Sequence, residues 1–420
     1  MLPATDTSPN GHKPRLLFCS WHSYLDPSSG AALATRDLWE LLASRGWPCK
    51  VFCGAALDFD GAIPGLVRDL GVPFVEKPGK DGPVPFSLFH YAQGGVPVTV
   101  FAPPPGGKVT GTPGDAEGKT FLNLCKRVFD QFRPDIMLTY GGHWLARAVM
   151  DLARRRGVRI VFGLHNFAYD KARDLFKYVD AVRVSSRFAQ THYRHMLGLE
   201  TTVIPGPWDW SRVRCESIDR RYVTFVNPQP AKGVFVFVRI ATELARLRPD
   251  IPMLVVEGRA NAGWLGQTGH DLTGVLNMHV LANTPDPRDF YRVSRVVLMP
   301  SLWRETFGRV AAEALINGIP VLGVRRGGLP EALENAGFLF DVPDQYTPDS
   351  REVPSAAEVA PWIETIIRLW DDEDFYQQEC ARCLAAAEKW RPEKLAPVFE
   401  EFFFRIFSKT EVLSPHQPEA

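Results

Sequence analysis

The stretch from Val297 to Glu331 constrains the fold of this chain more than any other segment of its sequence. An apolar run stops at Pro300, and a short polar loop leads into a helical segment that ends near Gly318. A second apolar run then meets the turn Gly327-Gly328, and Pro330 follows as the first residue of another helix. This repeated order of strand, loop and helix predicts a parallel sheet, which binds ligands at the carboxyl ends of its strands.

Two carboxylates, Glu305 and Glu313, flank the start of the first of these helices. A helix N-terminus offers free N–H groups and partial positive charge, which suit a phosphate. Here these groups are the amides from Thr306 through Phe307 and Gly308 to Arg309. A carboxylate would repel the phosphate but suits sugar hydroxyls, because it can accept two hydrogen bonds from a vicinal diol. The alternative is structural: Glu305 favours the helix dipole and Glu313 pairs with Arg309, one turn earlier.

The whole run of residues, taken in order, resembles a known family signature. Its parts are Pro300-Ser301, Glu305, Phe307-Gly308, Glu313, Gly318-Ile319-Pro320-Val321 and Gly327-Gly328-Leu329-Pro330-Glu331. They resemble the E-x7-E signature of retaining GT-B glycosyltransferases of the family 4 type. The resemblance implies an α/β fold with two Rossmann-like domains, whose parallel sheets face a central cleft. The expected domains are residues 1–212 for the acceptor, 213–390 for the nucleotide sugar, and 391–420 for a crossover helix and tail.

Composition narrows the classes of function. The 420 residues include 48 Lys plus Arg and 48 Asp plus Glu, and this zero net charge argues against a nucleic-acid partner. The polar stretch Met1 to Pro14 does not resemble a signal peptide, and no apolar run approaches the roughly 20 residues of a membrane span. We therefore expect a cytoplasmic protein. The apolar stripe of the helix predicted from Pro392 leaves peripheral contact with the inner membrane face open as an alternative.

In the first half of the chain, the strand predicted at Arg15 to Cys19 leads into a loop that contains Ser29 and Gly30. The family has a glycine pair there, for the approach of phosphate and acceptor, and this chain retains one glycine. A later strand, Val158 to Leu164, delivers His165 at its carboxyl end. The resemblance implies that His165 contacts the transferred sugar. The high content of proline and glycine from Lys77 to Gly118 predicts an irregular segment there.

In the second half, the strand predicted at Arg221 to Val226 is followed by the loop NPQPAKG. Lys232 lies in this loop, where its ammonium group would neutralise a leaving diphosphate. Asn227 occupies the nucleotide-sugar-binding position at which the family has an arginine. The lost charge would then come from Arg259 or, alternatively, from Arg304 or Arg325.

The resemblance implies a retaining glycosyltransferase, and the reaction scheme that it implies needs neither a metal ion nor a cofactor. The catalytic residues would be His165, Glu305 and Lys232, and Glu313 would bind the ribose diol. The donor would be a nucleotide-diphosphate sugar, with UDP favoured and GDP left open. The acceptor would be a glycan, a lipid-linked molecule or a small molecule. Two alternatives remain, an epimerase of nucleotide sugars and a catalytically inactive scaffold with the same fold. A Rossmann dehydrogenase is disfavoured, because no G-x-G-x-x-G follows the first strand of either domain.

Overall fold

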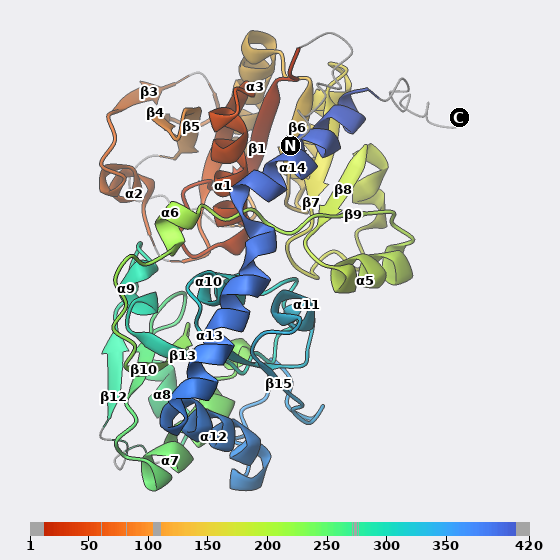
Figure 1. The fold of residues 1–420 in the computed structure, drawn as a ribbon. Coiled ribbons are helices and arrows are strands. Elements are labelled where there is room, and N and C mark those ends of the chain that lie inside the picture. Colours follow the sequence, from red (N-terminus) through yellow and green to blue (C-terminus); the bar gives the residue numbers. More distant parts are fainter. Residues whose placement is uncertain are drawn as a thin grey trace. The chain divides into compact units, whose positions relative to one another are not determined.

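The structure is a computed structural model of the chain, and it describes residues 12–59, 61–80, 82–103, 111–270, 272, 275 and 277–408. These residues form two units (Figure 1). The first unit takes its described residues from Met1–Ser185, Gln190–Pro207 and Pro392–Ala420. The second takes its residues from Ser186–Ala189 and Trp208–Arg391. Each unit contains its own β-sheet, so each is described separately.

The sheet of the first unit has the strand order β3-β4-β5-β2-β1-β6-β7-β8-β9. The strands are β1 (Leu16–His22), β2 (Cys49–Ala56), β3 (Phe74–Gly79), β4 (Phe86–Gln93), β5 (Val96–Ala102), β6 (Ile136–Thr139), β7 (Arg159–Gly163), β8 (Ala181–Val184) and β9 (Thr202–Val203). From β5 through β9 every neighbouring pair is parallel, as in a doubly wound fold. The predicted strands before the Ser29 loop and before His165 correspond to β1 and β7.

The prediction of an irregular segment from Lys77 to Gly118 was wrong for much of its length. The structure forms an antiparallel ribbon there, in which β4 pairs with both β3 and β5. Gly94 and Gly95 make the turn between β4 and β5, and both have the positive φ that a tight hairpin turn requires. Pro97 points outward between the buried Val96 and Val98, so it did not prevent strand formation. Residues 104–110 of the same segment lie outside the described residues.

Six α-helices of the described residues have most or all of their residues in the first unit. They are α1 (Gly30–Ser44), α2 (Ile63–Asp69), α3 (Asp115–Phe132), α4 (Trp144–Arg154), α5 (Arg187–Leu197) and α14 (Pro392–Phe407). Of these, α1, α3 and α4 contact the sheet. The last helix, α14, packs against α1, although the two are far apart in the sequence. Glu400 on α14 accepts hydrogen bonds from Arg45 at 2.8 and 2.9 Å and from the indole nitrogen of Trp47 at 3.0 Å. These contacts, with the apolar stripe beneath them, fix α14 to the first unit.

The sheet of the second unit has the strand order β12-β11-β10-β13-β14-β15, with parallel pairing throughout. Its strands are β10 (Tyr222–Val226), β11 (Met253–Val256), β12 (Met278–Leu281), β13 (Ser294–Met299), β14 (Val321–Val324) and β15 (Phe338–Phe340). Its helices are α6 (Trp210–Val213), α7 (Val234–Leu247), α8 (Gly263–Gly266), α9 (Arg288–Tyr291), α10 (Arg309–Ile316), α11 (Leu329–Leu333), α12 (Ala356–Asp371) and α13 (Glu373–Ala387). The stretch from Val297 to Glu331 thus folds in the predicted order, as β13, α10, β14 and α11.

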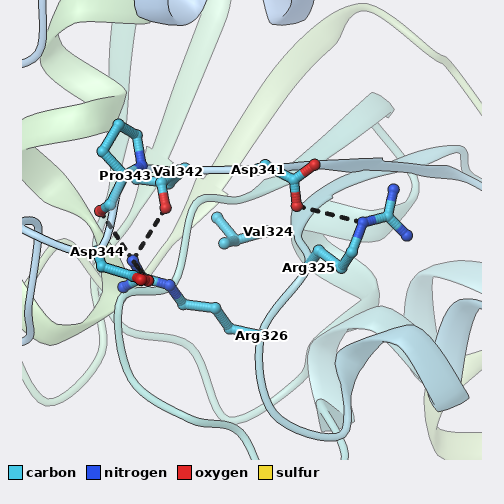
Figure 2. Close-up of a pocket in the computed structure, with 7 residues that line it drawn as sticks. All are labelled: Val324, Arg325, Arg326, Asp341, Val342, Pro343 and Asp344. Carbon is cyan, nitrogen blue, oxygen red and sulfur yellow. Dashed lines mark hydrogen bonds and ion pairs between the residues drawn. The ribbon is translucent and has the colours of Figure 1, made fainter.

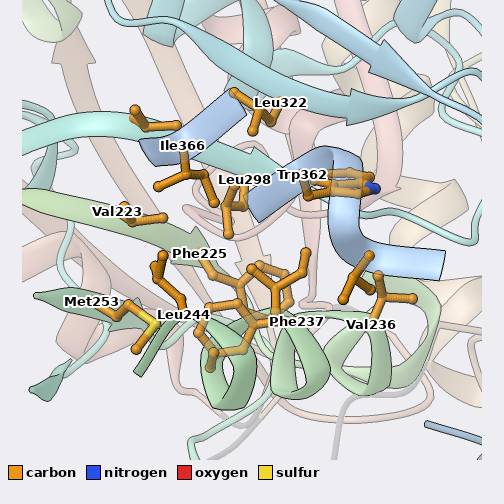
Figure 3. Close-up of a cluster of buried hydrophobic side chains, with 14 of the residues drawn as sticks. Val223, Phe225, Val236, Phe237, Leu244, Met253, Leu298, Leu322, Trp362 and Ile366 are labelled. Carbon is orange, nitrogen blue, oxygen red and sulfur yellow. The ribbon is translucent and has the colours of Figure 1, made fainter. Parts of the chain in front are cut away.

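Buried apolar side chains hold α7 and α12 to this second sheet (Figure 3). Phe225 on β10 stacks on Phe237 of α7, with the ring centroids 4.5 Å apart. On α12, Trp362 stacks on Phe340 of β15 at the same centroid distance. The central strands β10 and β13 are largely buried, as expected where helices cover a parallel sheet, whereas β15 lies at the edge and is partly exposed. The carboxyl ends of β10 and β13 are therefore held on a rigid support.

Candidate active site

Two loops of the second unit meet at the carboxyl ends of β10 and β13, which are adjacent strands. The backbone N–H of Trp303 donates to the carbonyl of Ala231 at 2.8 Å. A Cβ atom on Gly233 would lie only 1.9 Å from the carbonyl oxygen of Pro300, so this position requires glycine for space as well as for its φ of +85°. The loop that carries Lys232 and the loop that carries Glu305 are therefore packed backbone to backbone.

The Gly327-Gly328 turn after β14 holds the Glu305 loop from its other side. The N–H of Gly328 donates to the carbonyl of Glu305 at 2.7 Å. A Cβ atom would lie 2.5 Å from the Glu305 carbonyl oxygen if built on Gly327, and 2.4 Å from that of Thr306 if built on Gly328. The glycine pair of the signature thus allows a close approach between backbones, which fixes Glu305 and Thr306 in place.

Lys232 and Glu305, two of the three predicted catalytic residues, form an ion pair with each other. The ammonium group of Lys232 donates to Oε1 of Glu305, and the hydroxyl of Ser301 donates to the same oxygen at 2.9 Å. The side chain of Lys232 is 30% exposed and that of Glu305 is 14% exposed. A cation and a carboxylate therefore lie together where the two loops meet, and the ammonium group is accessible to solvent.

Glu313 lies deeper in the same unit and is buried. Its Oε1 pairs with Nε of Arg309 at 2.6 Å, and its Oε2 accepts a hydrogen bond from the hydroxyl of Tyr291 at 3.0 Å. The structural alternative given for Glu313, pairing with Arg309, is therefore confirmed. It does not exclude a second role, since a carboxylate has about four acceptor positions. Burial, followed by the charge of Glu313, raises the pKa of Tyr291 well above its ordinary value, so Tyr291 remains a donor.

Asn227 has a structural role at the end of β10. Its φ is +64°, a region that asparagine enters more readily than most residues. Its side-chain oxygen accepts a hydrogen bond from the N–H of Ala260 at 3.1 Å, which ties the loop after β11 to the end of β10. Arg259 lies exposed on that same loop. The structure therefore brings Asn227 next to the segment that carries Arg259.

Arg325 and Arg304 are the other two arginines that could replace the missing charge. Arg325 lines a pocket formed by the segments that follow β14 and β15 (Figure 2). Its guanidinium group pairs with Asp341 at 3.3 Å and donates to the carbonyl of Leu339. The neighbouring Arg326 donates to three backbone carbonyls of the loop after β15. This pocket, of about 480 Å³, is thus built around structural arginine contacts. Arg304 lies exposed beside Glu305.

Phe307 and Gly308 shape the start of α10. The ring of Phe307 is buried against Trp208 and Trp390, each with a centroid distance of 5.7 Å, so only its backbone is suited to ligand binding. Gly308 has a φ of +105° and forms the N-cap of α10. The N–H groups before Arg309 therefore lie at a helix start, as the sequence predicts.

The remaining predicted residues, His165, Ser29 and Gly30, lie in the first unit. His165 follows β7 and is mostly buried, and this burial lowers the pKa of its imidazole to about 3, so the ring is neutral at pH 7. Ser29 is the N-cap of α1 without a capping hydrogen bond from its side chain. A Cβ atom on Gly30 would contact nothing within 4 Å, so packing within the described chain does not require a glycine there.

The sequence reasoning missed three polar residues near His165, namely His22, Tyr140 and His143. All three lie where β1 or β6 ends, which is the signal that could have identified them.

No group of three or more His, Cys, Asp or Glu side chains in the described ranges is arranged to hold a metal ion. Cys380 and Cys383 are buried on α13. In the same ranges, no helix combines the length and apolar character needed to span a membrane.

Two Rossmann-like units, one of which carries an intact E-x7-E run, define a protein of the GT-B fold class. Comparison with family models agrees. Residues 29–207 match the model described as a glycosyl transferase 4-like domain, and residues 218–347 match that of glycosyl transferases group 1. The chain belongs to the group 1, family 4-like glycosyltransferases.

Curated relatives match only part of the chain. D-inositol 3-phosphate glycosyltransferase of Corynebacterium efficiens is 30% identical over 165 residues, which are 37% of this chain and 35% of that protein. Spore coat protein SA of Bacillus subtilis is 25% identical over 191 residues, which are 41% of this chain and 50% of that protein. The matched region thus spans between a third and a half of the length of these relatives.

Solved structures match almost the whole chain. The Anabaena protein HepE, solved in complex with UDP and glucose, has a TM-score of 0.66 at 18% identity, over 92% of this chain and 99% of that one. The pneumococcal O-GlcNAc transferase GtfA, solved with UDP and GlcNAc, has a TM-score of 0.63 at 11% identity, over 95% of this chain and 100% of that one. At these identities the likeness establishes the fold.

Proposed function

We propose that this protein is a retaining glycosyltransferase that moves a sugar from a UDP-sugar donor to an acceptor hydroxyl. The observation that carries the proposal is the meeting of Lys232 and Glu305 just before α10. A sugar diphosphate needs a cation and N–H donors for its phosphates, and an acceptor of hydrogen bonds for its sugar hydroxyls. Lys232, the N–H groups at the start of α10, and Glu305 supply these three functions on one rigid support.

In the proposed reaction the bond between the sugar C1 and the diphosphate oxygen breaks. The negative charge that develops on the diphosphate is met by Lys232 and by the N–H groups near Gly308. A new bond forms between C1 and the acceptor oxygen on the same face of the sugar. The proton of the acceptor hydroxyl passes to the departing diphosphate, so the scheme uses no protein base, metal ion or cofactor.

Three further residues have binding roles in this scheme. Glu305 accepts hydrogen bonds from sugar hydroxyls once the diphosphate has drawn Lys232 away from it. Glu313, whose carboxylate contacts Arg309 and Tyr291, binds the ribose diol, because one carboxylate can accept several hydrogen bonds. His165, neutral at pH 7 because burial lowers its pKa to about 3, forms hydrogen bonds to the transferred sugar.

The choice of UDP over GDP is supported by the solved relatives HepE and GtfA, whose structures contain UDP. A melting-temperature panel with UDP, GDP and ADP tests it directly. A nucleotide that binds only the folded protein stabilises it by about 2.7 kcal/mol at a concentration of 100 times its Kd. We expect UDP to give the largest rise in melting temperature. A larger rise with GDP or ADP would overturn the choice of donor.

A second measurement separates the proposed reaction from the two alternatives. UDP-glucose is incubated with the protein, and both UDP release and isomerisation of the sugar are followed. Isomerisation of the donor without release of UDP would identify an epimerase. The absence of a melting-temperature response to every nucleotide, together with no turnover, would identify an inactive scaffold.

A further inference from the structure

Three polar side chains of the first unit converge at the carboxyl ends of β1 and β6. His22 is the last residue of β1, Tyr140 directly follows β6, and His143 is the N-cap of α4. The ring of His22 lies 5.8 Å from that of Tyr140 and 5.8 Å from that of His143, centroid to centroid. The donor chemistry proposed above uses none of these three residues, which are named here the acceptor cluster.

The acceptor cluster contains polar atoms that the protein itself leaves unsatisfied. Nδ1 of His22, the hydroxyl of Tyr140 and Nε2 of His143 are buried, and none has a hydrogen-bond partner among the described residues. Tyr140 as a whole is only 7% exposed. Such atoms destabilise a fold unless a bound molecule completes their hydrogen bonds. Their combination in one place therefore points to a ligand.

Gly141 shows that two of these atoms face the same small space. A Cβ atom built on Gly141 would lie 3.3 Å from Nε2 of His143 and 3.5 Å from Nδ1 of His22. Gly141 has a φ of +111°, and its N–H donates to the hydroxyl of Tyr169 at 3.1 Å. The backbone at Gly141 is thus held in a conformation that keeps side-chain atoms out of the space between the two imidazoles.

The chemistry of the acceptor cluster suits hydroxyl groups. The phenol of Tyr140 offers both a donor and an acceptor, and Nε2 of neutral His143 offers an N–H donor because its Nδ1 accepts from Ala146; an alcohol, which donates and accepts, can pair with both. Burial lowers the pKa of His143 to about 4, and it lowers the pKa of His22 even though the carboxylates of Asp58 and Asp26 raise it. Both rings are therefore neutral at pH 7. A phosphate bound here would meet no charged imidazole and would be repelled by the two carboxylates.

The acceptor cluster also adjoins a residue of the proposed reaction. The ring of Tyr140 packs edge to face with that of His165, with 5.5 Å between their centroids. His165 is the residue to which we assign contact with the transferred sugar. A molecule held by the acceptor cluster would therefore lie next to the position at which a sugar must be received.

Given the proposed glycosyl transfer, on which this inference rests, we infer that His22, Tyr140 and His143 bind the acceptor. The bound part is an uncharged sugar or polyol ring with neighbouring hydroxyl groups. In this respect the acceptor differs from inositol 3-phosphate, after which several of the partly matching relatives are named. The absence of a phosphate on the bound ring is the specific claim.

The test measures UDP release from UDP-glucose in the presence of glucose, mannose or myo-inositol, and of their monophosphates. We expect at least one neutral compound to accelerate UDP release and none of the phosphates to do so. Two variants then probe the acceptor cluster. Tyr140→Phe removes only the unsatisfied hydroxyl. His143→Asn removes Nε2 but keeps an acceptor for the N–H of Ala146, which Nδ1 of His143 caps at 3.2 Å.

Each variant should raise the KM for the stimulating compound about three- to tenfold, the value of one or two neutral hydrogen bonds. The affinity for UDP alone should stay at the wild-type value, because UDP is assigned to the second unit. Tyr91→Phe is the matched control, since it removes another buried and unsatisfied phenol, on β4, and should leave the KM unchanged.

The inference is overturned if only phosphorylated compounds accelerate UDP release, if no compound does so, or if both variants retain the wild-type KM. The proposed function would fail in a different way. In that case UDP would not raise the melting temperature and UDP-glucose would not be consumed at all.

Discussion

Replacing Glu305 with glutamine should make UDP bind more tightly, even though it removes a residue of the candidate active site. Without a ligand, Glu305 holds the ammonium group of Lys232, and the diphosphate must break this ion pair before it can bind the ammonium group itself. The pair is partly exposed, with 30% of the lysine and 14% of the glutamate side chain accessible, so solvent screens it. A partly exposed pair of this kind contributes about 1 kcal/mol.

Glu305→Gln releases that free energy for UDP binding. Since 1.4 kcal/mol corresponds to a tenfold change, about 1 kcal/mol predicts a roughly fivefold gain in UDP affinity. Turnover of UDP-glucose should fall at the same time, because glutamine is a weaker acceptor for the sugar hydroxyls than a carboxylate. Lys232→Met should weaken UDP binding, and adding Glu305→Gln to it should then have little effect, because the partner of Glu305 is already absent.

Isothermal titration calorimetry with UDP at low salt measures these affinities. The matched control is Glu243→Gln on α7, which removes the same charge from a carboxylate that is 13% exposed and paired with Arg239 and Arg246. The control should leave UDP affinity unchanged. An unchanged or weakened affinity in Glu305→Gln would refute the idea that the ion pair competes with the diphosphate.

Three further predictions concern the rest of the protein. Glu313→Gln should lower UDP affinity about tenfold by calorimetry, because a hydrogen bond to a charged group is lost; wild-type affinity would exclude the ribose role. Phe237→Ala should lower the free energy of unfolding by about 3–5 kcal/mol in urea, because the stacked partner of Phe225 leaves a cavity; a loss below about 1 kcal/mol would contradict this packing. The pKa of His143 falls from 6.5 to about 4 on folding, so the unfolded chain binds more protons between these pH values. Stability should therefore decline as pH falls through this window, by up to about 1.4 kcal/mol per pH unit, and His143→Asn should reduce the slope measured by urea denaturation.

The sequence predicts most of the second unit because its signals are local. Apolar runs mark β13 and β14, Gly318 ends α10, and the paired glycines before α11 mark a tight turn. The ribbon of β3, β4 and β5 was missed because its Pro and Gly residues resemble those of a loop. The alternation of Val96, Val98 and Val100 and the Gly94-Gly95 turn together carried the correct signal.

Side-chain partners could not be predicted in the same way. The pairing of Lys232 with Glu305 joins residues 73 positions apart, and it depends on how two loops pack at neighbouring strand ends. The acceptor cluster could not be predicted for the same reason. His22, Tyr140 and His143 come from separate strand ends, and none of them stands out in the sequence.

Glycine contacts explain why the signature motif locates the site, although the side-chain pairs within the site cannot be predicted from the sequence. Gly233, Gly327 and Gly328 each lie so close to a neighbouring backbone that a Cβ atom would fall within 2.5 Å of a carbonyl oxygen. Because these contacts join backbones, they fix the positions of the loops whatever side chains the loops carry. Asn227 is an example. It stands where the family pattern has an arginine, and its side chain accepts a hydrogen bond from the adjacent loop. The loop framework can therefore persist while its charges change, and in the proposed function Lys232 and the N–H groups of α10 meet the diphosphate where the family pattern also has an arginine.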